Sequence, residues 1–327
     1  MNIPGMVKWI VIGILTLSIL IVVINIPTYL EFQEQMKDSR ERLLAGSHII
    51  QTRNGSIEYA QTGQGYRVLV VHGAGGGYDQ GLFISEIFLS EDFRVIAPSR
   101  YGFLRTPLPA NATPAAQADA YIDFLDALNI SKVAVIGFSA GGPSSLEFAL
   151  RHPDRVSALV LVSAVVHKEK PIDLKDIIIH YLIFKSDFLF WMIPKNFESS
   201  SLSFFGIPPE VQANLTPDEK RWLSEVFVPS MNPISQRQAG MLNDRINSVF
   251  LDYQLDEINV PTLIVYARDD TLVNRSHSES AARKIPDAKV IVLESGGHIL
   301  MGNHERVRSE IVEFLRYNTL DQMVREP

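Results

Sequence analysis

The chain has 327 residues, of which 46% are hydrophobic and 20% charged, and its formal net charge is −7. This length accommodates one large α/β domain with additions or two ordinary domains, and the composition is too apolar for a disordered chain. The acidic balance and the lack of clustered lysine and arginine exclude nucleic acid as the main partner. Because the sequence contains no cysteine, disulfides, a thiol nucleophile and cysteine-based metal sites are also excluded.

The first feature along the chain is an uncharged, apolar segment, residues 9–30. Its length suits the roughly 20 residues that span a bilayer core, and Trp9 and Tyr29 fall where interfacial aromatic rings are common. A cleaved signal peptide would have a shorter apolar run followed by a cleavage site of small residues. No such site occurs in the residues from Asn25 onward. A buried core helix would normally carry a polar stripe. We therefore expect residues 1–30 to form a single-pass transmembrane anchor.

The orientation of this anchor stays open. Counts of lysine and arginine slightly favour a cytoplasmic C-terminal domain, but long domains translocate largely regardless of nearby charge. Residues 31–46 are predicted to form a polar, charge-mixed helix or stalk. After Gly46 the composition changes to short apolar runs separated by glycine and proline, so we expect the globular domain to begin at residue 47.

The globular part begins with a predicted hairpin and continues with buried strands. Two short alternating stretches within residues 48–60 meet at Asn54-Gly55, a pair typical of hairpin turns. The later apolar runs are nearly continuous in valine, isoleucine and leucine, as expected of parallel strands covered on both faces. These predicted strands are residues 67–72, 93–97, 132–138, 156–163, 262–267 and 289–293.

Helix signals separate the predicted strands. Thr113-Pro114 supplies an N-cap followed by proline at the first helical position, and a second helix is expected over residues 140–151, ending before Pro153. A last helix is predicted over about residues 305–317, with apolar side chains spaced for core contact. This alternation predicts an α/β fold with a mainly parallel central sheet and helices on both faces.

One stretch, residues 167–250, breaks the alternation because it contains no strand pattern. It is rich in large apolar side chains and is most simply a helical cap over the carboxyl edge of the sheet. Its polar residues Arg237, Asn243 and Asp244 are candidates to face a substrate. The core is therefore expected in two parts, residues 47–166 and residues 251–327.

The motif Gly137-Phe138-Ser139-Ala140-Gly141 falls where a predicted strand ends and a helix begins. In this strand–turn–helix context, a G-x-S-x-G sequence holds its serine exposed on a tight turn. The glycines are needed because side chains beside the serine would clash in such a turn. Alone the motif is a weak signal, since any glycine-rich turn can supply one.

A second glycine-rich segment, residues 72–77, follows the first buried strand. Its flexible glycines allow a backbone N–H to point into a site, and the N–H after a nucleophilic serine supplies a second donor to an oxyanion. We expect these donors to be the backbone N–H groups of Ala74 and Ala140. A phosphate-binding loop is excluded, because neither G-x-G-x-x-G nor a following Gly-Lys-Ser/Thr occurs.

Two further loops each follow a predicted strand. Arg268-Asp269-Asp270 comes after residues 262–267, and Gly296-Gly297-His298 comes shortly after residues 289–293. A serine hydroxyl is a poor nucleophile at neutral pH unless a histidine takes its proton, and a carboxylate must orient that imidazole. Serine, aspartate and histidine occur here in the chain order of α/β hydrolases.

With these four motifs, residues 48–318 resemble the α/β-hydrolase superfamily, in its cap-bearing branch of esterase-like and haloperoxidase-like enzymes. The resemblance implies Ser139 as the nucleophile, His298 as general base and acid, and Asp269 or Asp270 as the orienting carboxylate. In the family pattern a valine follows the acid by two or three residues, which favours Asp270.

One segment departs from the family pattern. Relatives often carry an aspartate followed by x-Gly-x-Gly-x-Ser after the second buried strand, whereas this chain has Ser99-Arg100-Tyr101-Gly102-Phe103-Leu104-Arg105. The departure weakens any subfamily assignment without affecting the expected fold. Ser139 excludes the aspartate nucleophile that epoxide hydrolases and dehalogenases of this fold use.

The resemblance implies a serine hydrolase, and with the expected anchor the protein would be membrane-anchored. The simplest expectation is a carboxylic ester hydrolase that forms an acyl-enzyme with a small-molecule substrate carrying an apolar acyl group. The same triad also serves C–C bond hydrolysis, perhydrolysis and aminopeptidase chemistry, and some proteins of this fold bind ligands without turnover. We expect no cofactor, and no metal ion because the histidines lack partners at metal-ligand spacing. The expected partners are the substrate and, through residues 1–30, the membrane.

Overall fold

The computed structural model describes residues 26–323, with side chains as far as residue 319. The chain divides into two compact units between Leu44 and Ala45, and residues 26–44 are helical. The apolar segment predicted to cross a membrane, residues 9–30, lies largely outside the described residues. Within the described part of the chain, no single helix has the length and hydropathy needed to cross a bilayer. A pair of helical segments bent by 104°, Leu174–Ile183 and Asp187–Asn196, meets these criteria only when taken together.

The second unit contains an eight-stranded sheet in the order β1-β2-β4-β3-β5-β6-β7-β8. β2 is antiparallel to β1 and to β4, and all other neighbouring strands are parallel. The strands are β1 (His48–Thr52), β2 (Gly55–Thr62), β3 (Tyr66–Val71), β4 (Phe93–Pro98), β5 (Val133–Phe138), β6 (Val156–Val162), β7 (Thr262–Ala267) and β8 (Lys289–Leu293). The predicted hairpin and all six predicted buried strands are confirmed.

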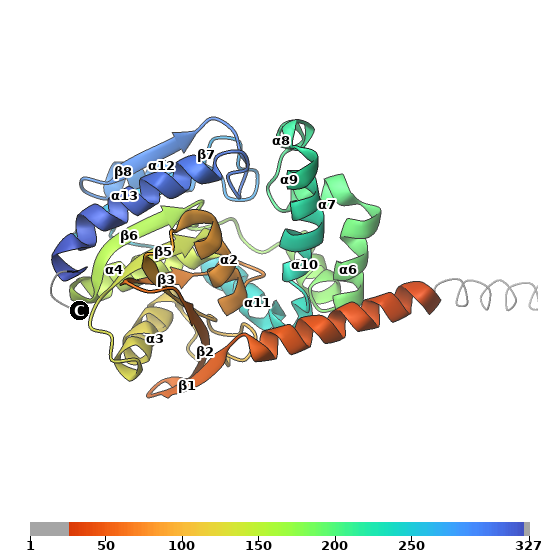
Figure 1. Ribbon diagram of the computed structural model, residues 1–327, viewed down its shortest axis with the longest axis horizontal. Coiled ribbons are helices and arrows are strands. Elements are labelled where there is room, and N and C mark those ends of the chain that lie inside the picture. The colour runs from red at the N-terminus through yellow and green to blue at the C-terminus, as the bar shows by residue number, and fades with distance from the viewer. Residues whose placement is uncertain (1–25, 324–327) are drawn as a thin grey trace, which may run out of the picture. The chain divides into compact units, whose positions relative to one another are not determined.

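Helices cover both faces of this sheet (Figure 1). On one face lie α2 (Tyr78–Phe88) and α13 (His304–Met323), and on the other lie α3 (Pro114–Ala127), α4 (Gly142–Arg151) and α12 (Ser276–Lys284). Successive residues of a strand point to opposite faces, so Val68 and Val70 join the α2–α13 core while Leu69 and Val71 join the α3–α4 core. Burial on both faces explains why the strand sequences are apolar throughout.

The first predicted helix, α3, begins where its capping residue indicates. Thr113 caps α3, because its hydroxyl oxygen accepts a hydrogen bond from the Ala116 N–H at 3.2 Å, and Pro114 follows at the first helical position. α2 and α12 were not predicted from the sequence. Neither helix begins with a side-chain cap, so the usual start signal is missing at both.

Between β6 and β7 the chain forms helices and loops without a strand. In Figure 1 these helices gather to one side of the sheet, and we call them the cap. Several of its large apolar side chains, among them Phe184, Phe190 and Phe227, are buried and join the same core as the α2–α13 face. The helices are α5 (Leu174–Ile178), α6 (Asp187–Asn196), α7 (Glu198–Phe204), α8 (Pro209–Asn214), α9 (Pro217–Trp222), α10 (Val228–Ser230) and α11 (Gln238–Ser248).

Candidate active site

Ser139 lies on a sharp turn between β5 and α4. Its φ of 52° is in the left-handed region, which is costly for a residue with a side chain. The two glycines of the motif are required by close packing. A Cβ atom at Gly137 would lie 2.6 Å from Ser145 Oγ, and one at Gly141 would lie 2.4 Å from the carbonyl oxygen of Val71. Only glycine therefore allows this turn to sit so close to β3 and α4.

A continuous chain of hydrogen bonds joins the three residues predicted to act together. His298 Nε2 lies 2.9 Å from Ser139 Oγ, and His298 Nδ1 lies 2.8 Å from Asp270 Oδ2. All three residues are buried. Because a carboxylate can only accept, Nδ1 carries the imidazole proton and Nε2 is left to accept the serine proton. The structure thus brings Ser139, His298 and Asp270 together in the arrangement that activates a serine hydroxyl.

The two neighbouring aspartates have different contacts. Asp270 Oδ1 accepts hydrogen bonds from the N–H groups of Leu272 and Val273, at 2.8 and 3.0 Å, which leaves Oδ2 for His298. Asp269 points to the loop before the histidine. It accepts from the Ser295 hydroxyl at 2.7 Å and from the N–H groups of Gly296 and Gly297 at 3.2 and 2.9 Å. Asp270 therefore contacts the imidazole, and Asp269 shapes the loop that carries it.

The glycine-rich loop, residues 72–77, lies beside the serine. A Cβ atom at Gly73 would be 2.9 Å from Ser139 Cβ, so the two backbones approach closely. The Gly73 N–H donates to Gln80 Oε1 at 2.8 Å, whereas the Ala74 N–H has no acceptor among the described residues. Ala140 is the second residue of the helical turn after β5, where backbone N–H groups lack helical acceptors. Ala140 thus follows Ser139 directly, and Ala74 follows the glycine that packs against Ser139.

His72 is held as a neutral imidazole at the start of this loop. Its Nε2 accepts the backbone N–H of Arg100 at 2.9 Å, so Nδ1 carries the proton and donates to the Gly73 carbonyl oxygen at 2.8 Å. Burial, assisted by the nearby Arg100 guanidinium, lowers the pKa of His72 well below its ordinary value. His72 therefore supports the loop and is not placed to shuttle protons.

Two cap residues considered for substrate contact are instead in ion pairs with the core. Arg237, which is fully buried, holds Asp79 through two hydrogen bonds of 2.9 and 2.8 Å. Asp244 holds Arg100 through two hydrogen bonds of 2.6 and 2.7 Å. The sequence singled out neither pairing, because the partners are 158 and 144 positions apart in the chain.

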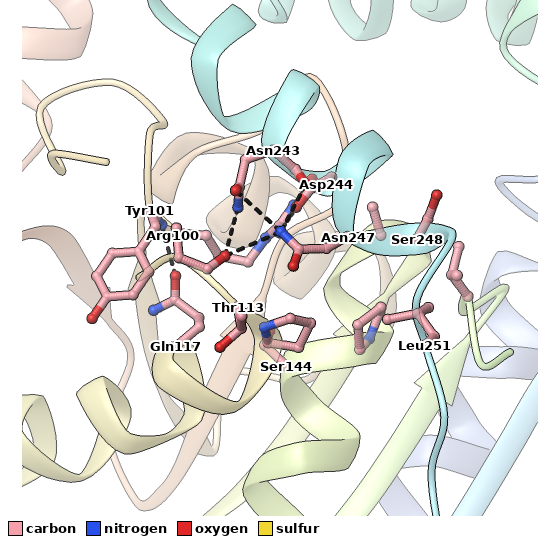
Figure 2. A pocket seen from close by; sticks show the side chains of 15 residues that line it. Arg100, Tyr101, Thr113, Gln117, Ser144, Asn243, Asp244, Asn247, Ser248 and Leu251 are labelled. Carbon is pink, nitrogen blue, oxygen red and sulfur yellow. Dashed lines mark hydrogen bonds and ion pairs between the residues drawn. The ribbon is translucent and has the colours of Figure 1, made fainter. Parts of the chain in front are cut away.

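A cavity of about 50 Å³ adjoins the serine turn (Figure 2). It lies between the loop after β4, the first turns of α3 and α4, and α11, and its wall includes Ala140 but neither Ser139 nor His298. Asn243 and Asn247, on α11, both donate to the Ala112 carbonyl oxygen, at 2.8 and 3.2 Å. Asn243, the third polar cap residue considered for substrate contact, thus ties the cap to the core.

In the part of the chain that the structure describes, no group of three or more His, Asp or Glu side chains is placed to hold a metal ion. The chemistry available at Ser139 is that of its hydroxyl, the adjoining imidazole and the free backbone donors. This combination suits nucleophilic attack on a carbonyl carbon, with the developing oxyanion held by N–H groups.

Comparison with known proteins identifies the family. The model of the alpha/beta hydrolase family matches residues 68–310. The chain is 30% identical over 258 residues to the uncharacterized hydrolase YcgS of Bacillus subtilis (strain 168), covering 75% of this chain and 89% of that protein. It is 27% identical over 272 residues to a 2-hydroxymuconate semialdehyde hydrolase of Pseudomonas putida, covering 77% and 87%. An alpha/beta hydrolase fold protein from Nakamurella multipartita superposes with a TM-score of 0.71 at 30% identity, covering 83% and 99%. The chain belongs to the alpha/beta hydrolase family.

Proposed function

We propose that this protein hydrolyses carboxylic esters through an acyl-enzyme formed on Ser139. The observation that carries the proposal is the hydrogen-bond chain from the Ser139 hydroxyl through His298 to Asp270, with distances of 2.9 and 2.8 Å. A serine so placed has a base to take its proton and a carboxylate to stabilise the imidazolium that results. Membership of a hydrolase family agrees with this chemistry.

In the acylation half, Ser139 Oγ attacks the carbonyl carbon while its proton passes to His298 Nε2. The carbonyl oxygen becomes an oxyanion and accepts hydrogen bonds from the backbone N–H groups of Ala74 and Ala140. When the tetrahedral intermediate collapses, the ester C–O bond breaks and the imidazolium gives its proton to the departing alkoxide. The products are an alcohol and an acyl group on Ser139, and His298 is neutral again.

In the deacylation half, water takes the place of the alcohol. His298 removes a proton from that water, whose oxygen attacks the acyl carbonyl carbon, and the same two N–H groups hold the second oxyanion. Collapse of this intermediate breaks the bond to Ser139 Oγ, which recovers its proton from His298. A carboxylic acid leaves, and the enzyme returns to its starting state.

We infer that the substrate carries an apolar group, because an apolar side chain of the cap, that of Met231, reaches the glycine-rich loop. A Cβ atom at Gly75 would lie 3.1 Å from the Met231 sulfur. Matched p-nitrophenyl esters with acetyl, butyryl and octanoyl chains test the inference. A preference for the longer chains supports it, and a preference for acetyl contradicts it.

C–C bond hydrolysis is the second candidate reaction, favoured by the 27% identity to a protein named 2-hydroxymuconate semialdehyde hydrolase. The same Ser139 machinery would serve it, and also perhydrolysis or aminopeptidase activity. A panel of esters, vinylogous diketones, peroxide with an acyl donor, and aminoacyl amides separates these reactions by relative kcat/KM. Binding of a panel member without turnover would instead mark a ligand-binding protein.

We further propose that the uncharged segment, residues 9–30, anchors the enzyme in a membrane as a single-pass span. Expression of the full chain followed by alkaline carbonate washing of membranes tests this. The wild type is expected to stay in the pellet, and a double variant with Leu15→Lys and Val22→Lys is expected to be released. Release of the wild type would contradict the proposal.

Labelling with a fluorophosphonate probe tests the catalytic assignment. The full-length wild type, solubilised in detergent, is expected to react covalently, while Ser139→Ala and His298→Ala are not. Circular dichroism shows whether each variant is folded. A folded wild type that resists the probe, or a Ser139→Ala variant that reacts at the wild-type rate, would overturn the assignment.

A further inference from the structure

Arg100 contacts the glycine-rich loop through its backbone N–H and two of its guanidinium nitrogens. It lies in the loop after β4 and is buried. Its Nε donates to the His72 carbonyl oxygen at 2.9 Å and its Nη2 donates to the Gly73 carbonyl oxygen at 3.2 Å. One guanidinium thus bonds two consecutive carbonyl groups of the loop, and the Gly73 carbonyl also accepts from His72 Nδ1 at 2.8 Å.

These contacts set the direction of the N–H groups on the same peptide planes. In a trans peptide the C=O and the following N–H point in opposite directions. The N–H opposite the His72 carbonyl is that of Gly73, and it is taken by Gln80 Oε1 at 2.8 Å. The N–H opposite the Gly73 carbonyl is that of Ala74, which faces away from Arg100 and has no acceptor among the described residues. A flip of this one peptide would remove the donor and present a carbonyl oxygen instead.

The guanidinium is in turn held by the cap. The Asp244 carboxylate, on α11, accepts hydrogen bonds from Nη1 at 2.6 Å and from Nη2 at 2.7 Å. This bidentate geometry orients a planar guanidinium. Burial raises the pKa of Asp244, and the Arg100 charge opposes that rise. The pair therefore needs both partners, since either charge left alone at this depth would be strongly unfavourable.

We propose that Arg100 is a positioning residue through which Asp244 of the cap fixes the Ala74 N–H of the oxyanion hole. The inference rests on the proposed function and adds to it a physical link between the cap and transition-state stabilisation. When Asp244 holds the guanidinium, the Gly73 carbonyl points to Arg100 and the Ala74 N–H points to the oxyanion. When the link is broken, only His72 Nδ1 still holds the Gly73 carbonyl. The Gly73–Ala74 peptide then rotates more readily, which leaves the hole half formed.

Asp244→Asn removes the charge of the cap residue with little change in shape, and a second cap–core pair supplies a matched control. Arg237 and Asp79 form a similar two-pronged bond between cap and core, but neither side chain bonds a carbonyl of His72 or Gly73. Asp79→Asn therefore loosens the cap by the same chemistry without releasing the peptide. Any general effect of a loosened cap appears in both variants.

The measurement compares two inhibitors on the full-length wild type and both variants. With a trifluoromethyl ketone, Ser139 Oγ adds to the carbonyl carbon, its proton passes to His298, and the alkoxide occupies the oxyanion hole. The methyl ketone of the same chain length binds without forming that alkoxide. We expect Asp244→Asn to reduce the preference for the trifluoromethyl ketone by about 10-fold or more, since one lost donor costs about 100-fold or more in rate. Asp79→Asn should leave the preference unchanged.

Arg100→Lys is a second route to the same result, because a lysine ammonium can pair with Asp244 but cannot hold two carbonyls in the fork geometry of arginine. It should also lose the preference for the trifluoromethyl ketone, and it decides the matter if Asp244→Asn does not fold. An unchanged preference in the folded variant, or an equal loss in Asp79→Asn, would overturn the proposal. Failure of the proposed function would look different, because the wild type itself would then show no preference.

Discussion

The backbone N–H of His298 donates a hydrogen bond to the carbonyl oxygen of Gly206, at 2.9 Å. Gly206 belongs to the cap, where it follows α7 with a φ of 77°. The loop that carries the imidazole is thus supported from one side by Asp269 and from the other by the cap backbone. Cap and core together define the position of His298.

Gly206→Ala is expected to displace the imidazole. The added Cβ would lie 2.6 Å from His298 Cβ and 2.7 Å from Leu272 Cβ, so one of these backbones must move. A shift of about 1 Å at a reacting group can cost roughly 100-fold in rate. We therefore predict a fall of about 100-fold in kcat for ester hydrolysis.

Gly302→Ala is the matched control for this prediction. Gly302 has a similar φ of 73°, so alanine meets the same left-handed backbone penalty, but no atom lies within 4 Å of its added Cβ. Both variants should lose about 1 kcal/mol of stability from backbone strain. Only Gly206→Ala should lose activity, and equal kcat values for the two variants would contradict this account.

Asp270→Asn and Asp269→Asn are expected to differ sharply. An asparagine at 270 can no longer stabilise the imidazolium and can hold the wrong tautomer of His298, which costs about 10⁴-fold in kcat in a comparable triad. An asparagine at 269 keeps one of the two oxygens that accept from the loop. We expect a loss of about 10-fold, the size of one lost hydrogen bond, because Asp269 does not contact the imidazole. Steady-state kinetics on a p-nitrophenyl ester provides the test, and a larger loss at 269 than at 270 would reverse the assignment.

The folding stability of the protein is expected to fall as the pH drops below about 6.5, the ordinary pKa of histidine. Burial, assisted by Arg100, lowers the pKa of His72, and burial also lowers the pKa values of His180 and His304. Below pH 6.5 the unfolded chain therefore binds more protons than the folded chain, so acid favours unfolding. Each histidine contributes at most about 1.4 kcal/mol per pH unit. Urea unfolding from about pH 7.5 to about pH 5.5 should show a falling midpoint, and a constant midpoint would refute the prediction.

Ser99 occupies the position where the family pattern leads us to expect an aspartate, and Glu58 supplies a buried carboxylate beside it. Glu58, on β2, accepts hydrogen bonds from the hydroxyls of Ser47 and Ser99 at 2.7 and 3.2 Å and from Arg105 Nε at 2.6 Å. Ser99→Asp would place two carboxylates side by side, a repulsion of about 4 kcal/mol at 4 Å in a protein-like medium. We predict that Ser99→Asp lowers the urea midpoint and that adding Glu58→Gln restores it. A stable single variant would show this explanation to be wrong.

Much of the fold was predictable because its signals are local in the sequence. Strands β3 to β8 could be predicted because burial on both faces makes their sequences apolar throughout. The start of α3 could be predicted because Thr113 is a capping residue and Pro114 suits the first helical position. α2 and α12 could not be predicted in the same way, since neither has a side-chain cap at its start. Local patterns thus identified an element only where its own residues carry a signal, such as an apolar run or a capping side chain.

The site shows the same division. The strand–turn–helix context of Ser139 and the loops after β7 and β8 predicted which residues meet, and the structure brings them within hydrogen-bonding distance. The pairs Arg100–Asp244 and Arg237–Asp79 could not be predicted, because each joins segments far apart in the sequence and leaves no periodic pattern. The available signals were an arginine in the loop that departs from the family pattern and the polar residues Arg237 and Asp244 in a cap rich in apolar side chains.

Trapping of the acyl-enzyme shows directly whether Ser139 is the nucleophile. The full-length wild type is mixed with a p-nitrophenyl ester, quenched in acid within milliseconds, and its intact mass and peptides are measured by mass spectrometry. We expect a mass increase equal to one acyl group, located on the peptide that contains Ser139 and absent from Ser139→Ala. Turnover of the ester without an acylated intermediate, or acylation at another residue, would contradict it.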